Sequence, residues 1–511
     1  SHHIAGDSAY PVTVGAYGLG KFTVNTNCAS RTSAAIRLIG VSGVIIKDCK
    51  LIGNNGGAPY GIFIENSSTN ILMKNITVLR CDIGGFYTND PYGYGGEIFV
   101  SGCTGVGVES RCIPSAGINK LSVIQNVLHG LDGPGSPDDN GYTGAGTAKN
   151  ITNVIIRENH VFDIGGKPKG YSGTLGNGIL VQATDGAVVE RNVVHDLAGN
   201  VNTCGGAAGI WAYRANNVKI KFNEAYNVRP LVRPTTIGCD WNGFDFDRDV
   251  TNSVMEFNYS HDNYGAGYLL FGGGIWGPNT VRFNVSENDG QVGNGWFAGI
   301  TVSASTESMP FQIYNNTIYT NVSKIKDPLG KPGKTPGITF TNGKGIRPSP
   351  NGLVANNIFF SVANTNGVSP LIGNQGTDVS SVKFLSNNYY SSGTPEIMWF
   401  LHGVDKPIKP IYTSITSWQS ATGQDPRAIT VNPKLRMPGS AGICKEGLAG
   451  CLSAYQFINN TSTTDSEASP MVGTGVNLRM SPYFFNTGLT DLWGNLLPKT
   501  SGFNIGVQAG P

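Results

Sequence analysis

Short runs of alternating apolar and polar residues recur along the middle of the chain. Five of them begin with glycine, as in "GIWAYR" from Gly209 and "GFDFDR" from Gly243. A period of two predicts β-strands, whose successive side chains point to opposite faces. Counted from the glycine, the first and third residues can fill an interior: Ile179/Val181, Ile210/Ala212, Phe244/Phe246, Tyr268/Leu270 and Ile300/Val302. The second and fourth then point outward: Leu180/Gln182, Trp211/Tyr213, Asp245/Asp247, Leu269/Phe271 and Thr301/Ser303.

A second phrase lies between these strands: a short apolar run, then Asn, then an aromatic residue or His three positions later. The asparagines are Asn126, Asn159, Asn192, Asn223, Asn258, Asn284, Asn316, Asn357 and Asn388. Most of the gaps are too short for a domain and suit one coil of a solenoid. They also leave no room for helical crossovers, which excludes a doubly wound sheet. We therefore predict an all-β fold, a right-handed parallel β-helix, with the asparagines forming a ladder at one turn.

Two regions interrupt the repeat. Residues 84–118 and 130–149 are rich in Gly, Pro and Asp, and we expect them to form long loops beside one face. Residues 393–455 lose the repeat and are expected to cover an open end of the solenoid. This gives a β-helix over residues 1–392, with these insertions, and a C-terminal cap with a final associated segment over residues 393–511.

Composition changes the picture chiefly by exclusion. Charged residues make up 14% of the chain and the net charge is +2, which gives no electrostatic case for a nucleic-acid partner. No apolar run approaches the roughly 18 residues that a membrane span requires. The first residues, "SHHIAGDSAY", lack the form of a signal peptide. We expect a mature, secreted protein that is soluble and monomeric.

The chain has nine cysteines, so at least one is free or pairs between chains. Cys444 and Cys451 lie close enough in sequence for a local disulfide, as do Cys103 and Cys112. Cys49 and Cys81 end strand-like segments and are interpreted as small buried hydrophobic residues.

The stretch "GCDWNGFDFDRD", Gly238 to Asp249, concentrates four carboxylates: Asp240, Asp245, Asp247 and Asp249. A solvated strand face is the simple interpretation, since outward residues of a β-helix face water. Three observations favour a functional one. Neighbouring coils place large apolar residues at the outward positions, Trp241 and Trp276 lie in adjoining turns and suit sugar rings, and like charges this close raise a pKa at a cost in stability.

Carboxylate spacing suggests the chemistry. Alternate residues of a strand lie roughly 6.5 to 7 Å apart, close to the separation at which an acid and a base share a water in an inverting glycosidase. Asp240, in the turn before the strand, is placed to fold back toward either. The candidate pairs Asp240/Asp245, Asp245/Asp247 and Asp240/Asp247 all stay open, and Asp249 is the least favoured member.

The phrases "VSGVIIKDCKLIGN" and "DLWGNLLPKTSGFNIGVQAG", with the Asn repeat, resemble the pectin-lyase-like superfamily of β-helical, polysaccharide-active proteins over roughly residues 10 to 400 and the tail. The resemblance implies the fold and a carbohydrate ligand. It does not imply one reaction, because this fold hosts several. The acidic stretch is also similar to β-helical glycosidases of the lacto-N-biosidase type, which use two aspartates seven residues apart. Asp240 and Asp247 have that spacing.

A glycoside hydrolase is the preferred prediction, with Asp240, Asp245 and Asp247 as catalytic candidates and no cofactor. The predicted substrate-binding residues are Trp211, Tyr213, Arg214, Trp241, Arg248, His261, Tyr268 and Trp276. A calcium-assisted lyase for a uronate polymer is the first alternative, with clustered Asp residues as Ca²⁺ ligands and Arg214 or Arg248 as base. A glycan-binding tailspike or adhesin is the second. His129, His195 and His261 share their slot with aromatic residues and are expected to stack.

Overall fold

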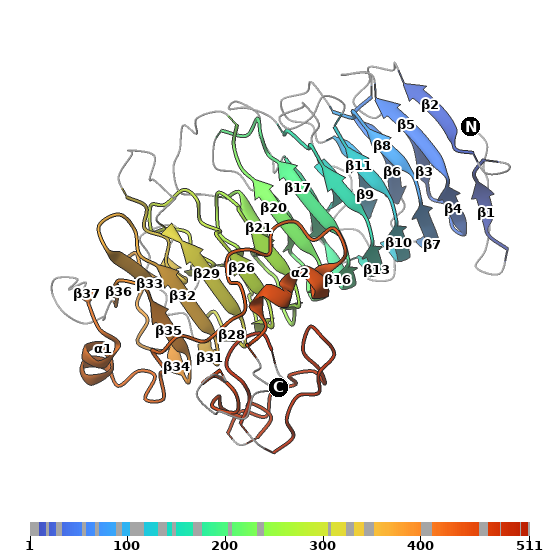
Figure 1. Cartoon of the computed structure of the whole chain (residues 1–511). Helices are drawn as coiled ribbons and strands as arrows, with labels where there is room; N and C mark the ends of the chain where they lie inside the picture. Colours follow the sequence, from blue (N-terminus) through green and yellow to red (C-terminus); the bar gives the residue numbers. More distant parts are fainter. Residues whose placement is uncertain are drawn as a thin grey trace. The chain divides into compact units, whose positions relative to one another are not determined.

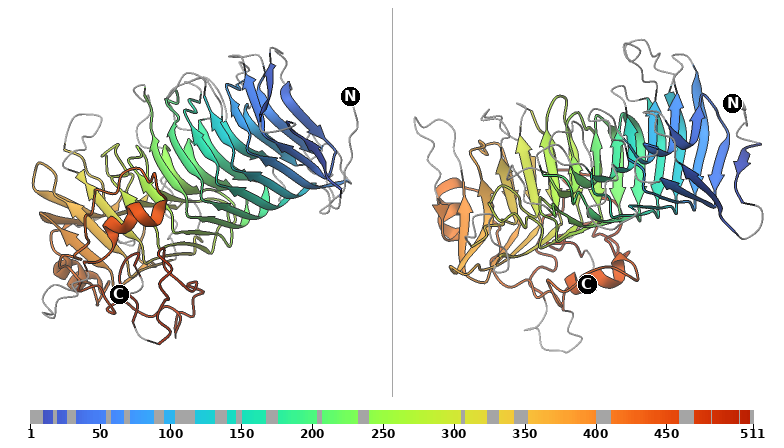
Figure 2. Two further views of the ribbon diagram at one scale, coloured as in Figure 1. Left: turned by 45° about the vertical axis from the view of Figure 1, so that its right-hand side comes forward. Right: turned by 90° about the horizontal axis from the view of Figure 1, so that it is seen from above.

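The computed structural model describes residues 10–508, apart from residues 17–19, 27–32, 54–57, 67–70, 88–94, 103–116, 131–139, 146–149, 167–175, 203–206, 232–239, 305–307, 323–331, 342–351, 400–410, 459–468, 481 and 501. Contacts divide the chain into two compact units, Ser1–Ser253 and Val254–Pro511. In each unit, parallel strands stack in three sheets, and successive strands of the chain visit the three sheets in turn (Figures 1 and 2). The predicted parallel β-helix is confirmed.

The three sheets of the first unit are named A, B and C. Sheet A contains β1 (Val12–Val14), β4 (Val44–Lys47), β7 (Leu72–Leu79), β10 (Gly117–Ile124), β13 (Ile151–Arg157), β16 (Thr184–Glu190) and β19 (Asn216–Lys221). Sheet B contains β2 (Phe22–Thr26), β5 (Cys49–Gly53), β8 (Asp82–Gly84), β11 (Val127–His129), β14 (His160–Phe162), β17 (Val193–Leu197) and β20 (Glu224–Val228). Sheet C contains β3 (Ala34–Ile39), β6 (Tyr60–Asn66), β9 (Gly96–Gly102), β12 (Asn140–Ala145), β15 (Asn177–Gln182), β18 (Ala208–Tyr213) and β21 (Asn242–Phe246).

The second unit repeats this arrangement. One sheet contains β22 (Val254–Glu256), β25 (Asn279–Arg282), β28 (Phe311–Tyr314), β31 (Gly352–Ala355) and β34 (Lys383–Leu385). Another contains β23 (Tyr259–His261), β26 (Val285–Glu287), β29 (Thr317–Asn321), β32 (Ile358–Val362) and β35 (Asn388–Ser391). The third contains β24 (Tyr268–Gly272), β27 (Ile300–Ala304), β30 (Ile338–Thr341), β33 (Val368–Asn374) and β36 (Thr394–Met398), with β37 (Ile411–Tyr412) antiparallel to β36.

Residues predicted to fill the coil interior are buried. Ile210, Ala212, Phe244 and Phe246 of β18 and β21 are 0% exposed. The outward residues Leu180 and Trp211 instead form a separate apolar cluster with Ala208 and the ring of Tyr213. The period of two therefore places side chains on the correct faces of these strands.

The predicted asparagine ladder is present in both units. In the first unit, Asn126, Asn159 and Asn192 each donate backbone and side-chain hydrogen bonds to the side-chain oxygen of the Asn in the next coil, ending at Asn223. In the second unit, the ladder runs through Asn258, Asn284, Asn316, Asn357 and Asn387. Asn388, predicted from the sequence for the last position, does not belong to the ladder, so this part of the prediction is wrong. Asn388 instead donates to the carbonyls of Ile429 and Val431.

An aspartate ends the ladder of the second unit. Asp425 Oδ2 accepts hydrogen bonds from the backbone and side-chain amides of Asn387 and from the Tyr389 hydroxyl. The last position of the ladder needs an acceptor, which a carboxyl supplies as well as an amide does. Burial raises the pKa of Asp425, and the hydrogen bonds from Asn387 oppose that rise.

When the pH is raised from 4 to 8, we expect the Asp425→Asn variant to lose less stability than the wild-type protein does. The folded-state pKa of Asp425 lies above its unfolded value, so this carboxyl destabilises the fold increasingly as the pH rises from about 4 through the folded pKa. Asn is neutral throughout. Melting temperatures at the two pH values, with exposed Asp185→Asn as the control, measure the difference; parallel curves would contradict the expectation.

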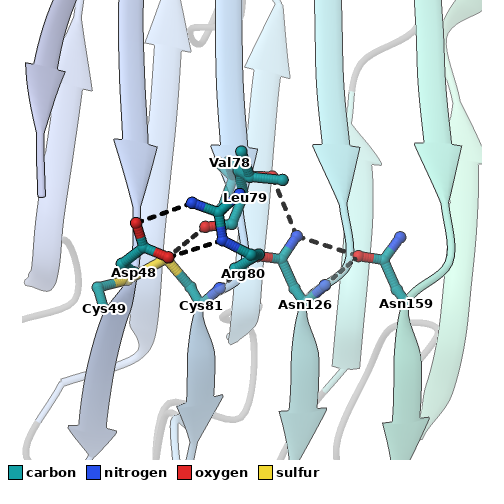
Figure 3. Close-up of a disulfide and its surroundings, with 8 residues drawn as sticks. All are labelled: Asp48, Cys49, Val78, Leu79, Arg80, Cys81, Asn126 and Asn159. Carbon is teal, nitrogen blue, oxygen red and sulfur yellow. Dashed lines mark hydrogen bonds and ion pairs between the residues drawn. A yellow bond between two sulfur atoms is a disulfide. The ribbon is translucent and has the colours of Figure 1, made fainter. Parts of the chain in front are cut away.

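Two disulfides are present among the described residues. Cys444 and Cys451 form the predicted local bridge. Cys49 and Cys81 are joined as well, which corrects their interpretation as unpaired buried residues (Figure 3). Cys49 begins β5 and Cys81 directly precedes β8, the next strand of sheet B. The two cysteines therefore occupy equivalent positions of successive coils, which brings their sulfurs together. Cys103 and Cys112 lie outside the described residues.

The predicted insertions contain coil strands. Residues 84–118 include β9 and residues 130–149 include β12, and these two strands pair in parallel within sheet C. The other predicted loop residues lie largely outside the described residues. The strands β9 and β12 were not predicted because the Gly-rich and Pro-rich residues around them supply few of the alternating apolar residues that mark the other coils.

Beyond the last strands, the second unit contains α1 (Ile415–Thr422), α2 (Leu448–Cys451) and the 3-10 helix η3 (Leu452–Tyr455). Trp418 of α1 is fully buried and packs against Phe384, Tyr389 and Trp399. The boundary proposed at residue 392 thus falls within a unit that α1 shares with the last coils. Neither α-helix in the described part of the chain is long and apolar enough to cross a bilayer.

Candidate functional site

The candidate site lies around β21 in the first unit. Asp240 and Trp241 immediately precede the strand, and both have positive φ, 64° and 59°. The backbone amide of Trp241 donates to the Ala207 carbonyl at 2.7 Å, and that of Asp247 donates to the Ala212 carbonyl at 3.0 Å. Hydrogen bonds to the preceding coil therefore fix the backbone on both sides of β21.

Asp245 projects from the outer face of β21 but does not face water. It is 5% exposed, and its register partner on β18 is Trp211, which is 2% exposed. The outward direction predicted for Asp245 is confirmed, whereas the simple interpretation of a solvated strand face does not hold for its side chain. Burial raises the pKa of Asp245 well above its ordinary value, and the charges of Asp247 and Asp240 raise it further.

Asp247 follows the end of β21 and is half-buried. Burial raises the pKa of its carboxyl to about 7, with the charges of Asp240 and Asp249 adding to the rise. The backbone amide of Arg248 donates to Asp247 Oδ1 at 2.6 Å and, with the Arg248 charge, opposes it. Asp247 is therefore a carboxyl that titrates near neutral pH while keeping contact with solvent.

Trp211 Nε1 and Asp245 Oδ1 are buried polar atoms without a hydrogen-bond partner among the described residues. Each such atom costs about 1 to 3 kcal/mol when left unsatisfied in a folded protein. A hydroxyl group can accept a hydrogen bond from the indole and donate one to the carboxyl. Both atoms are closed to solvent in this structure, so a ligand hydroxyl could bind them only if the groups that cover them moved aside.

Tyr213 and the two arginines lie at the end of these strands. Arg214 and Arg248 occupy equivalent positions of adjacent coils, joined by a hydrogen bond from the Arg214 amide to the Arg248 carbonyl. The Arg214 guanidinium lies over the Tyr213 ring, 5.0 Å from its centroid, and 4.0 Å from Asp249 Oδ2. Tyr213 is half-buried and Arg248 exposed, so both can contact a ligand.

The predicted sugar platforms are less open than expected. Trp241 is 0% exposed, Trp211 2% and, in the second unit, Trp276 4%. A sugar ring stacks on an accessible aromatic face, which these three indoles do not present. Only the sequence-predicted outward direction of Trp211 is confirmed. Indole rings favour sugar contact and core packing equally, so sequence alone could not separate the two.

Tyr268 and His261 also belong to the second unit, and neither is open to a substrate. Tyr268 is fully buried, and its hydroxyl donates to the carbonyls of Asn258 and Val285, so its interpretation as a substrate contact is wrong. The same alternation had already predicted an interior position for it. His261 is 2% exposed, stacks on Tyr259 and contacts Asp262 Oδ2 through Nδ1 at 2.9 Å.

The other histidines stack as predicted. On sheet B, the rings of His129, Phe162, His195 and Tyr226 follow one another at centroid distances of 5.3, 5.4 and 4.6 Å. His160, which the sequence analysis did not single out, brings its Nε2 within 2.7 Å of Nε2 of His195. No three His, Cys, Asp or Glu side chains in the described ranges gather into a metal site.

Comparison with known proteins adds a relationship. No protein-family model matches the chain. A stretch of 226 residues is 28% identical to a lacto-N-biosidase of Bifidobacterium longum subsp. longum. This stretch is similar to a glycosidase. It covers 42% of the present chain and only 12% of that curated relative.

Solved structures with some likeness to the chain are also carbohydrate-active proteins. The crystal structure of a GH136 lacto-N-biosidase from Eubacterium ramulus gives a TM-score of 0.44 at 17% identity, covering 66% of this chain and 60% of that one. A PL6 family alginate lyase gives a TM-score of 0.38 at 15% identity, covering 83% of this chain and 51% of that one.

Proposed function

We propose that the chain is a glycoside hydrolase that cleaves an oligo- or polysaccharide with the carboxylates of the β21 stretch. One observation carries the proposal: Asp240, Asp245 and Asp247 influence one another electrostatically, and the half-buried Asp247 has its pKa raised to about 7. Glycosidic bond cleavage requires one protonated and one ionised carboxyl, and an environment that separates their pKa values supplies both. The sequence similarity to a lacto-N-biosidase supports the same reaction class.

In the proposed mechanism, Asp247 is the general acid. At neutral and lower pH it holds a proton that it can give to the leaving oxygen of the glycosidic bond. Asp240, also half-buried, acts as the ionised partner, either as base toward water or as nucleophile toward the sugar. Its negative charge helps to keep the proton on Asp247. This choice among the three candidate pairs agrees with the seven-residue spacing.

Asp245 is proposed to bind rather than to react. Its carboxyl is enclosed, and burial raises its pKa well above the ordinary value, which favours the neutral form. When substrate binding moves aside the groups that cover them, Asp245 Oδ1 and Trp211 Nε1 would hold one sugar hydroxyl between them. Tyr213 and Arg248 are the accessible neighbours proposed to contact the sugar.

We further propose that the protein acts outside the cytosol as a monomer. The disulfides Cys49–Cys81 and Cys444–Cys451 support an oxidising compartment, because disulfides persist in secreted proteins and are rare in the cytosol. The hydrolytic reaction proposed needs no cofactor; Ca²⁺ belongs to the lyase alternative.

The deciding experiment is a panel of oligosaccharides that begins with a lacto-N-biose glycoside and includes uronate polymers. Products are measured both as reducing sugar and as the absorbance of an unsaturated uronate, with and without EDTA. Reducing ends without that absorbance and without EDTA sensitivity are expected. The absorbance would replace the proposal by a calcium-assisted lyase, and binding without turnover would replace it by an adhesin.

Above pH 7, kcat/KM is expected to fall about tenfold per pH unit, because Asp247 loses its proton. Asp240→Asn removes a charge that raises the pKa of Asp247. The remaining activity of this variant should therefore begin to fall at a lower pH than that of the wild type. A pH–rate profile of both proteins tests this, and an unmoved limb would contradict the electrostatic coupling of the two residues.

A further inference from the structure

A groove crosses the outer face of sheet A in the first unit. Its volume is about 690 Å³, and its lining residues belong to β7, β10, β13, β16 and β19. Neighbouring strands lie about 4.8 Å apart, so the groove extends roughly 19 Å along the coils. It lies on a different sheet from Asp245, which is on β21 of sheet C.

The groove exists because each of these strands bends at the same position. Its floor contains one row of residues with positive φ, between 53° and 79°: Asn75, Lys120, Asn153, Gly186 and Asn217. A left-handed residue within a strand interrupts the regular pleat and bends it. Parallel pairing keeps the bends in register from coil to coil, so they join into a continuous trough.

A second row beside the bend gives the groove mixed chemistry. It contains Thr77, Ser122, Ile155, Val188 and Lys219, which are paired in register. Hydroxyl and amide groups therefore lie beside small apolar surfaces. That combination matches sugar rings, which present hydroxyls at their edges and C–H groups on their faces. Aromatic side chains, on which nucleic-acid bases would stack, do not occur in this described lining.

The charge of the groove is positive. Lys120 and Lys219 are exposed, and the residues of the described lining include no Asp or Glu. On one flank, Glu190 is paired with Arg157 at 2.6 Å and with Lys221 at 3.2 Å. On the other flank, Asp185 accepts a hydrogen bond from Asn216 at 2.7 Å. The two lysines are three coils apart, roughly 14 Å, so they can hold two charges of one extended chain.

We propose that this groove binds an anionic oligosaccharide, carrying carboxylate or sulfate groups, that lies across the coils of sheet A. Lys120 and Lys219 pair with its charges, and the amide and hydroxyl side chains between them bind its hydroxyls. The site is independent of the catalysis proposed at β21. It holds the protein on an acidic glycan while a separate site acts.

The test uses residue types that the chain itself places in these rows. Lys120→Asn copies Asn75, which tolerates the same positive φ, and Lys219→Thr copies Thr77. The double variant therefore removes both charges without requiring a new backbone conformation. Lys445→Asn with Lys499→Thr, two exposed lysines of the second unit, makes the matched control.

Calorimetric titration at low salt would use oligogalacturonate as the carboxylate probe, dextran sulfate fragments as the sulfate probe and dextran as the neutral probe. Carrying Asp247→Asn in every protein separates binding from turnover. We expect binding of at least one anionic probe, weakened about tenfold in the Lys120/Lys219 variant and unchanged in the control. The probe that binds more tightly identifies the anionic group.

Three results would overturn the proposal: equal affinity of the folded Lys120/Lys219 variant, equal affinity of dextran and the anionic probes, or no binding of either anionic probe. A melting temperature of the variant equal to that of the parent confirms that it is folded. None of these results bears on the hydrolase, whose failure would appear only in the turnover assay.

Discussion

Asp247→Asn is expected to lower kcat/KM about 1,000-fold on the substrate that the panel identifies, a typical contribution of a general acid. The amide cannot donate the proton that the half-buried carboxyl holds near neutral pH. Folding should be preserved, because the side-chain oxygen of Asn can still accept the hydrogen bond from the Arg248 amide. Steady-state kinetics at pH 6 together with a melting curve measure both effects.

Asp249→Asn is the control for this substitution. It removes a carboxyl group two residues away, at a position whose positive φ of 58° Asn tolerates. Its carboxylate lies beside Arg214, and we expect kcat/KM within about threefold of the wild type. Near-normal activity of folded Asp247→Asn would remove Asp247 from the mechanism, and an equal loss in Asp249→Asn would show that the effect is not specific to Asp247.

Asn316→Ala is expected to lower the free energy of unfolding by about 4 kcal/mol, because several buried groups lose their partners at once. The side-chain oxygen of Asn316 accepts from the backbone and side-chain amides of Asn284. Its side-chain amide donates to the carbonyls of Val281 and Tyr314 and to Asn357. Urea denaturation followed by circular dichroism measures the loss.

Asn366→Ala provides the comparison for the ladder. Asn366 is exposed in a turn of the same unit, and we expect its replacement to change stability by less than about 0.5 kcal/mol. A loss below about 1 kcal/mol in Asn316→Ala would mean that backbone pairing, and not the ladder, carries the stability of the turn.

The repeat predicted the fold well because the geometry of each coil depends on residues that are close together in the sequence. Alternation in "GIWAYR" and "GFDFDR" placed Ile210, Phe244 and Phe246 inside, and the spacing of the asparagines placed the ladder. The error at its end has a simple cause: Asn387 and Asn388 are adjacent, and a repeat of variable length cannot choose between them. The strands β9 and β12 were missed because their flanking residues read as loop.

The acidic stretch was found correctly as a place where carboxylates meet, and its details were not. Sequence gives the direction of Asp245 from its strand, whereas its 5% exposure depends on what surrounds it. For the same reason it could not tell that Trp241 is closed to solvent and Tyr213 is not. The sheet A groove was not predicted because the residues that share a positive φ there are a mixture of Asn, Lys and Gly, which forms no recognisable sequence pattern.

The sequence by itself determined the coils, the ladder and the position of the acidic stretch within one coil, because strand periodicity and coil length depend on near neighbours in the chain. Only the tertiary structure decided which carboxyl is enclosed, which keeps contact with solvent at a pKa near 7, and which sulfurs meet in Cys49–Cys81. Burial, electrostatic coupling and disulfide pairing depend on groups that lie one coil or more apart in sequence, and stacking alone brings them together.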